Sequence, residues 1–250
     1  MKTPGIKLEI CAADIESVRV AEAAGAQRVE LCSALSEGGV TPSAGFIAEA
    51  RKSRGLGLMV LIRPRGGDFV YTPEEVDCMV ADIAACALLG ADGVVIGALT
   101  PDGDIDMEAC RRMVAAAGSM SVTFHRAFDM ARDPVRALED TIALGCERIL
   151  TSGQAPSAPE GAATLRRLHE LAAGRIRIMA GAGVKSSNLP TLIRDAQPDE
   201  IHASAGSMKA SAMRFRRADV KMGAPDADEF ARKSSDEAEV RALVDILANL

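Results

Sequence analysis

The stretches Gly25-Ala-Gln-Arg-Val-Glu-Leu31, Gly90-Ala-Asp-Gly-Val-Val-Ile96 and Gly145-Cys-Glu-Arg-Ile-Leu-Thr151 share one pattern, a glycine, a short turn and an apolar run. Glycine often ends a helix because it adopts the left-handed conformation without a steric penalty. A short apolar run bounded by turn residues is typical of a buried strand. Each stretch therefore predicts the end of a helix followed by a strand.

The same alternation runs along all 250 residues. We predict strands at residues 7–11, 28–32, 58–63, 93–97, 121–125, 148–152, 175–180 and 200–204. We predict helices at residues 15–24, 44–53, 73–89, 107–117, 134–144, 160–173, 188–196 and 236–249. This is the size and pattern of a single-domain α/β protein, a (β/α)8 barrel of the TIM type. A doubly wound open sheet is the alternative, but no Gly-x-Gly-x-x-Gly motif follows the first strand.

Residues 206–233 do not fit this alternation, because they show neither helical nor strand periodicity. A structureless segment of that length is uncommon in a compact domain. We predict an irregular segment before the last helix that serves in binding or in a contact between subunits.

The composition excludes several classes of partner. The chain carries a net charge of −6, only 3% of its residues are aromatic and none is Trp. Binding to nucleic acid would need a basic surface and aromatic side chains for stacking. The sequence contains neither the run of about 18–20 apolar residues that spans a membrane nor an apolar signal segment. We expect a cytoplasmic protein that binds neither nucleic acid nor a membrane.

Polar residues gather at the predicted carboxyl ends of the strands, where (β/α)8 barrels carry their chemistry. These residues are Glu9, Cys11, Glu30, Cys32, Arg63, Arg65, Asp68, His125, Arg126, Asp129, Thr151, Ser152, Gly153, Gly181, Gly183, His202 and Ser204. Any one of them is also compatible with a buried ion pair or a tight turn. Burying so many polar groups together without a function is costly, so we predict a functional cleft.

Within this cleft the residue types divide into two roles. His125, Glu9, Glu30 and Asp129 are candidates for proton transfer. The guanidinium groups of Arg63, Arg65 and Arg126 are candidates for holding an anion. The other anion-site or substrate-site candidates are Asp68, Thr151, Ser152, Gly153, Gly181, Gly183, His202 and Ser204, because barrels often bind phosphate after strands seven and eight.

Two of the six cysteines, Cys11 and Cys32, end consecutive strands. Neighbouring strands lie about 4.8 Å apart, so the two sulfur atoms are able to meet if the strands pair in register. A pair of thiolates suits a soft ion such as Cu(I), whereas zinc would need further ligands, for example His125 or His202. The alternative is that both are small buried apolar residues. The sequence has no Cys-x-x-Cys motif, and we expect free thiols.

Several strings resemble those of the CutC family, whose members are known as copper homeostasis proteins. They are Val29-Glu-Leu-Cys-Ser33, Glu37-Gly-Gly-Val-Thr-Pro42, Ile62-Arg-Pro-Arg-Gly-Gly-Asp-Phe69, Val122-Thr-Phe-His-Arg-Ala-Phe-Asp-Met130, Leu150-Thr-Ser-Gly153 and Ala180-Gly-Ala-Gly183. The resemblance implies a cytoplasmic barrel, a homo-oligomer (a dimer or a tetramer) and a role in copper handling with Cu(I) as the bound ion. The cysteines of the family's first two strand motifs are Cys11 and Cys32. The resemblance implies no particular reaction.

Two hypotheses follow for the function. In the first, Cys11 and Cys32 bind Cu(I) in a protein of copper homeostasis. In the second, the barrel is an enzyme that acts on a small anionic metabolite, phosphorylated metabolites included. No predicted strand end carries a lysine, which argues against Schiff-base chemistry and leaves proton transfer or metal-assisted isomerisation or hydrolysis.

Overall fold

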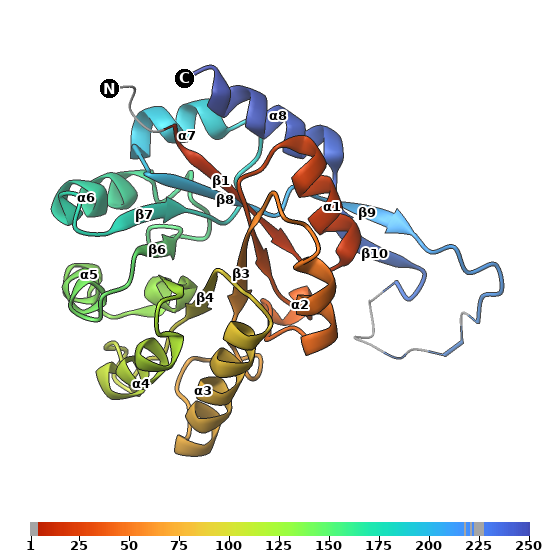
Figure 1. The fold of residues 1–250 in the computed structure, drawn as a ribbon. Coiled ribbons are helices and arrows are strands. Elements are labelled where there is room, and N and C mark those ends of the chain that lie inside the picture. Colours follow the sequence, from red (N-terminus) through yellow and green to blue (C-terminus); the bar gives the residue numbers. More distant parts are fainter. Residues whose placement is uncertain (1–4, 218, 221, 223–227) are drawn as a thin grey trace.

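The structure is a computed structural model that describes residues 5–217, 219–220, 222 and 228–250. Eight parallel strands close into a barrel in chain order, and β1 pairs with both β2 and β8 (Figure 1). The strands are β1 (Lys7–Ala12), β2 (Arg28–Leu31), β3 (Gly57–Leu61), β4 (Gly93–Ile96), β5 (Ser121–Phe124), β6 (Arg148–Thr151), β7 (Arg177–Ala180) and β8 (Glu200–Ala203). The predicted (β/α)8 barrel is confirmed, and the open sheet is excluded.

A helix follows each barrel strand, and the helices surround the barrel on the outside (Figure 1). They are α1 (Ile15–Ala24), α2 (Ala44–Ala50), α3 (Pro73–Leu88), α4 (Met107–Ala117), α5 (Pro134–Ala143), α6 (Ala162–Ala172), α7 (Leu189–Ala196) and α8 (Glu237–Ala248). Because the helices cover one face of the strands and the barrel interior covers the other, short strands such as β2 are buried at every position. In the described part of the chain, no helix has both the length and the apolar character needed to span a membrane.

The predicted boundaries need small corrections. Several strands end before the polar residue assigned to their tip, so Cys32, Arg63, His125, Ser152 and Ser204 lie in the loops that directly follow the strands. The helix predicted at residues 44–53 ends at Ala50, and the guanidinium of Arg51 donates to the carbonyl oxygens of Ser53 and Leu56 in the turn that follows.

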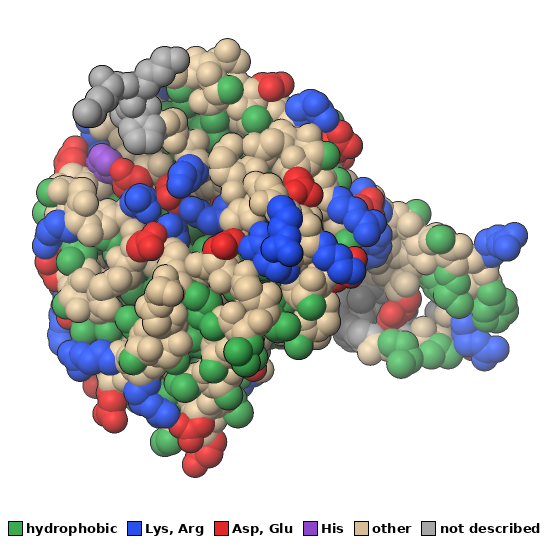
Figure 2. Space-filling model, viewed as in Figure 1, with side chains coloured by type: hydrophobic (Ala, Val, Ile, Leu, Met, Phe, Trp, Pro, Cys, Tyr) green, Lys and Arg blue, Asp and Glu red, His purple; other side chains and the backbone are tan. Residues whose placement is uncertain are grey.

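The segment 206–233 was predicted to be irregular, and this is wrong at both of its ends. β9 (Gly206–Ala210) and β10 (Ala231–Ser235) pair as antiparallel strands, and Figure 1 shows them running into an arm that projects from the barrel. The strands are short, and their pairing joins residues far apart in the sequence, so local periodicity does not predict them. Met208 and Phe215 in this segment are exposed. Figure 2 shows hydrophobic side chains on the projecting arm. The predicted subunit contact stays a prediction.

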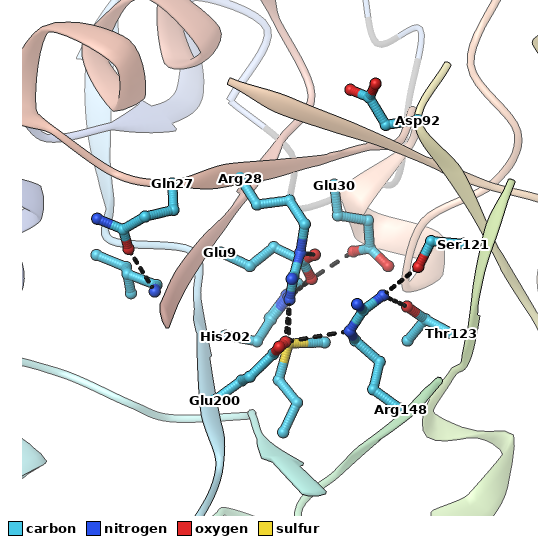
Figure 3. Close-up of polar contacts among 12 residues, drawn as sticks. Glu9, Gln27, Arg28, Glu30, Asp92, Ser121, Thr123, Arg148, Glu200 and His202 are labelled. Atoms are coloured by element: carbon cyan, nitrogen blue, oxygen red, sulfur yellow. Dashed lines mark hydrogen bonds and ion pairs between the residues drawn. The ribbon is translucent and has the colours of Figure 1, made fainter. Parts of the chain in front are cut away.

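A layer of buried charges fills the amino-terminal half of the barrel. The first residues of β2, β6 and β8 are Arg28, Arg148 and Glu200, and each is less than 8% exposed. Figure 3 shows Arg28 between two carboxylates, with its Nε donating to Glu9 and its Nη2 donating to Glu200. Arg148 lies on the other side of Glu200, with 3.1 Å between Nε and Oε2. The layer leaves no carboxylate without a cation.

Replacing the shared cation should destabilise the barrel strongly. We expect Arg28→Met to lower the free energy of unfolding by about 3–5 kcal/mol, because the buried Glu9 and Glu200 lose the cation they share and keep only His202 and Arg148 as buried partners. Denaturant unfolding measures the change. As a control, Arg112→Met removes the exposed ion pair with Asp77 and should cost less than about 1 kcal/mol. Equal effects of the two substitutions would contradict the assigned role of Arg28.

Candidate functional site

Two cavities lie at the carboxyl ends of the strands. The central cavity has a volume of about 320 Å³ and is lined by Cys11, Glu30, Gly38, Leu61, Arg63, Phe69, His125, Arg126, Asp129, Met130, Leu150 and His202. The β7–β8 cavity has a volume of about 910 Å³ and is lined by the loops after β7 and β8 and by the start of α8. Cys11, Arg126 and His202 line both cavities. These three residues therefore mark where the two cavities adjoin.

Cys11, Glu30 and His202 form a cluster of metal-ligand type. Their ligand atoms all lie within 4.8 Å of one another. The Sγ atom of Cys32 lies 3.5 Å from the Sγ atom of Cys11, which adds a second thiol to the cluster. One side of the cavity thus carries two sulfur atoms, an imidazole and a carboxylate.

The strand register explains why these residues meet. Cys11 on β1 is the partner of Glu30 on β2, and Glu9 on β1 is the partner of His202 on β8. Residues two apart on a strand face the same side, so Cys32 follows Glu30 toward the cavity. The two thiols meet, but not through the in-register pairing on which the prediction depended, because Cys11 is the register partner of Glu30 and not of Cys32.

Glu9 orients the imidazole of His202 from below the cluster. The Glu9 side chain is fully buried, and its Oε1 lies 2.8 Å from His202 Nδ1 while its Oε2 accepts a hydrogen bond from Arg28 (Figure 3). The other ring nitrogen of His202, Nε2, faces Glu30, with 3.8 Å between Nε2 and Oε2. A carboxylate on one imidazole nitrogen and a metal on the other is a recurrent arrangement in metalloproteins.

The buried charges shift the pKa values of this group in opposite directions. Burial raises the pKa of Glu9, but Arg28 and His202 outweigh it and lower the pKa to about 2. Burial lowers the pKa of His202, but Cys11, Glu9 and Glu30 together raise it well above 6.5. Burial also raises the pKa of Glu30 to about 7 despite the nearby His202. Glu9 is therefore a permanent anion, whereas Glu30 is able to gain or lose a proton near neutral pH.

The thiol of Cys11 is protonated at neutral pH in the absence of a metal. The hydrogen bond with Cys32 and burial both raise its pKa well above the ordinary value of 9.0. An ion bound by this sulfur therefore has to displace a proton.

His125 lies in the wall of the central cavity as a neutral imidazole. Its Nδ1 accepts a hydrogen bond from the backbone N–H of Ala127, and its Nε2 is buried without a hydrogen-bond partner among the described residues. Burial and the charge of Arg63 lower its pKa to about 3. A Cβ atom on Gly97 would come within 2.5 Å of the ring, so this glycine leaves the space that the imidazole fills.

Arg63 and Asp129 also line the central cavity, and both hold loops in place. The Arg63 guanidinium donates to the carbonyl oxygens of Glu37, Gly39 and Gly67. The Asp129 carboxylate accepts from Thr151 Oγ1, from the N–H groups of Ser152 and Gln154, and from Arg126. The contacts of Asp129 fix the loop after β6, a role different from the proton transfer predicted for it.

Other predicted site residues line neither cavity. They are Arg65, Asp68, Thr151, Ser152, Gly153 and Gly181. Arg65 forms an ion pair with Glu75, which belongs to the capping box at the start of α3, and Thr151 and Ser152 bind Asp129. Proximity along the chain placed them near the site, but the side chains of Arg65, Thr151 and Ser152 contact the surrounding loops.

Gly183 and Ser204 line the β7–β8 cavity, where an anion site was expected. One backbone donor of this loop is already occupied, because the N–H and hydroxyl of Ser186 both donate to the carboxylate of Glu239 on α8. Lys185 and Lys233 line the same cavity as Glu239, so the anion site predicted there stays a prediction.

Sequence reasoning missed Arg28, Arg148 and Glu200, which support the cluster from below. The sequence spacing could have identified two of them, because Arg28 lies two residues before Glu30, and Glu200 lies two residues before His202. With the period of two in a strand, both face the barrel interior. No sequence pattern distinguishes the apolar residues that line the cavity from ordinary core residues. They are Leu61, Phe69, Met130 and Leu150.

The neutral state of His125 predicts that acid destabilises the protein. In the unfolded chain the imidazole takes up a proton below pH 6.5, whereas the native imidazole stays neutral down to about pH 3. Stability is therefore lost as the pH falls between these values, by up to about 1.4 kcal/mol per pH unit, and nothing is lost above pH 6.5.

The variant His125→Phe isolates this effect. In denaturant unfolding from pH 7.5 to pH 4.5, its stability should fall less steeply with decreasing pH than that of the natural chain. His169→Phe, at a half-buried surface position, should keep the natural slope. A His125→Phe slope equal to that of the natural chain would contradict the neutral assignment.

The closed parallel barrel, with an interior cluster of thiol, imidazole and carboxylate groups, defines a (β/α)8-barrel protein with a candidate soft-metal centre. A sequence model of the CutC family matches residues 6–207. This chain belongs to the CutC family.

Relatives across bacteria and animals share nearly the whole chain. A protein called CutC from Chromobacterium violaceum is 54% identical over 240 residues, which covers 96% of this chain and 97% of that protein. The human copper homeostasis protein cutC homolog is 47% identical over 247 residues, which covers 98% of this chain and 90% of that protein. The crystal structure of CutC from Streptococcus agalactiae superposes with a TM-score of 0.76 at 35% identity, covering 80% of this chain and 98% of that one.

Proposed function

We propose that this protein binds Cu(I) in copper homeostasis, with Cys11 and Cys32 as the principal ligands. The observation that carries the proposal is the separation of 3.5 Å between the two Sγ atoms, one at the end of β1 and the other directly after β2. Thiolates are the preferred ligands of Cu(I), and two sulfur atoms this close are able to hold one ion between them. The names of relatives such as the human homolog point to the same role.

The surroundings of the two sulfur atoms fit such an ion. His202 offers Nε2 as a third ligand, and Glu9 holds the ring from the opposite nitrogen. Cys32 is buried and Cys11 is half-buried at the cavity wall, which limits access of water to the ion. The carboxylate of Glu30 is a harder ligand, and we assign it no bond to Cu(I).

A cytoplasmic location is part of the proposal, because the site needs reduced sulfur. In the structure all six cysteines are free thiols, the state that a reducing compartment maintains.

The test is a Cu(I) titration against a competing chelator without oxygen. We expect Cys11→Ser/Cys32→Ser to lower the affinity at least about a hundredfold, because hydroxyl groups are poor ligands for a soft ion. Cys78→Ser is the matched control, since Cys78 is an exposed thiol on α3, and it should bind as the natural chain does.

A second comparison separates Cu(I) from zinc. A zinc ion would use Cys11, His202 and the carboxylate of Glu30, so Glu30→Gln should weaken Zn²⁺ binding and leave Cu(I) binding within about threefold. If Cu(I) affinity depends on Glu30 but not on Cys32, the proposed ligand set is wrong.

A further inference from the structure

Two lysines line the β7–β8 cavity without an ion-pair partner among the described residues. Lys185 lies in the loop after β7, and Lys233 lies on β10. Both side chains are exposed, so a ligand in the cavity is able to reach them. By contrast, Lys209 on the neighbouring strand β9 forms an ion pair with Glu16 on α1. Two ammonium groups in one cavity repel each other, and an anion between them would remove the repulsion.

The Lys233 side chain lies across the backbone of β9, at a position where the chain has a glycine. A Cβ atom on Gly206 would come within 2.5 Å of Lys233 Cε and within 3.1 Å of its Cγ. Gly206 itself lines the cavity. The lysine stem therefore packs in the space that the glycine leaves, and this packing brings the ammonium group to the cavity wall.

The two carboxylates of the cavity are already used by the protein. Asp236 accepts hydrogen bonds from the backbone N–H groups of Ala238 and Glu239 at the start of α8. Both oxygens of the Glu239 carboxylate accept from Ser186, one from its N–H and one from its hydroxyl. Neither carboxylate forms an ion pair with a lysine of this cavity in the part of the chain that the structure describes. The ammonium groups thus remain available to an anion.

The backbone around the cavity adopts left-handed conformations at two alanines. Ala182 has φ of 75° and Ala205 has φ of 43°, and both line the cavity. Gly183 follows with φ of 72°, and its N–H has no hydrogen-bond partner among the described residues. Left-handed conformations at residues other than glycine cost about 1–3 kcal/mol and occur often at ligand sites. Turns with unused N–H groups are also typical anion sites.

The charge of the site favours a phosphate group over a carboxylate. A phosphate monoester carries a charge of about −1.5 to −2 at pH 7 and three acceptor oxygens. Two ammonium groups and a backbone N–H match that charge and those acceptors, whereas a carboxylate brings one negative charge only. In (β/α)8 barrels the loops after strands seven and eight frequently hold phosphate.

The size of the cavity favours a phosphate that is attached to an organic molecule. Its volume of about 910 Å³ is near the upper end of the range for organic ligands, roughly 300–1,000 Å³. The cavity adjoins the central cavity at Cys11, Arg126 and His202, which line both. A ligand whose phosphate lies between the lysines therefore has room for a polar body that extends toward these three residues.

We propose that the β7–β8 cavity binds a small phosphorylated metabolite, whose phosphate group is held by the ammonium groups of Lys185 and Lys233. The loop of Ala182 and Gly183 forms the wall beside the phosphate. The phosphate contacts use no residue that is assigned to Cu(I), so the site stands whether or not the metal proposal holds.

Ribose 5-phosphate is the probe for this site, because it joins a phosphate monoester to a small polar body. In the natural chain, titration with ribose 5-phosphate should give binding heat and should shift the amide NMR signals of Gly183 and Gly206. Inorganic phosphate should bind at least about tenfold more weakly because it lacks the body, and ribose, which lacks the charge, should not bind measurably.

Variants then test the assigned contacts by calorimetry. Lys185→Met/Lys233→Met should weaken binding of ribose 5-phosphate at least about tenfold, the effect of losing hydrogen bonds to a charged group. Lys185→Arg/Lys233→Arg keeps both charges and should bind within about threefold of the natural chain. Lys7→Met is the matched control, since Lys7 is an exposed lysine at the opposite, amino-terminal end of the barrel, and it should change nothing.

Three results would overturn the site. One is the absence of binding heat and of glycine amide shifts with up to about 10 mM ribose 5-phosphate. Another is inorganic phosphate that binds as tightly as the ester, because the body would then contribute nothing. The third is an equal loss of affinity in Lys7→Met and in Lys185→Met/Lys233→Met, which would indicate a general charge effect. The Cu(I) titration reports on the metal proposal separately.

Discussion

The structure depends on one shared charge, the guanidinium of Arg28 between the carboxylates of Glu9 and Glu200. Glu9 is fully buried, and an isolated carboxylate there would either take up a proton or prevent folding. With Arg28 on one oxygen it stays ionised and binds His202 through the other. The orientation and charge of that imidazole, and with them the cluster of Cys11 and Glu30, follow from the ion pair beneath.

The central cavity brings together two sets of groups with different chemistry. On one side are the soft sulfur atoms of Cys11 and Cys32 with the imidazole of His202. The other carries neutral His125 and charged Arg63, both buried and both with an unused donor among the described residues. A soft cation suits the first set, whereas the second set is part of the packed wall.

Local sequence patterns predicted the barrel almost completely, because each strand and helix has a periodicity or an end signal in its own residues. One example is the capping box of Thr72 and Glu75 at the start of α3. These patterns allowed the two thiols to meet only if their strands paired in register, and the observed register pairs Cys11 with Glu30 instead. They could not distinguish a ligand contact from a loop contact for Asp129 and Arg65, because a polar side chain near a strand end is compatible with both; in the structure both make loop contacts. They did not predict the β9–β10 pair, which joins residues on either side of a long loop.

The sequence by itself therefore determined the fold, the residues at each strand end and the family, because these depend on short-range periodicity and on specific strings. Only the tertiary structure decided which buried groups are charged. Whether His125 is neutral and whether Glu9 is ionised depend on burial and on partners contributed by other strands and loops. Desolvation and hydrogen bonding act through space, and closing the barrel brings β8 beside β1 from opposite ends of the sheet order.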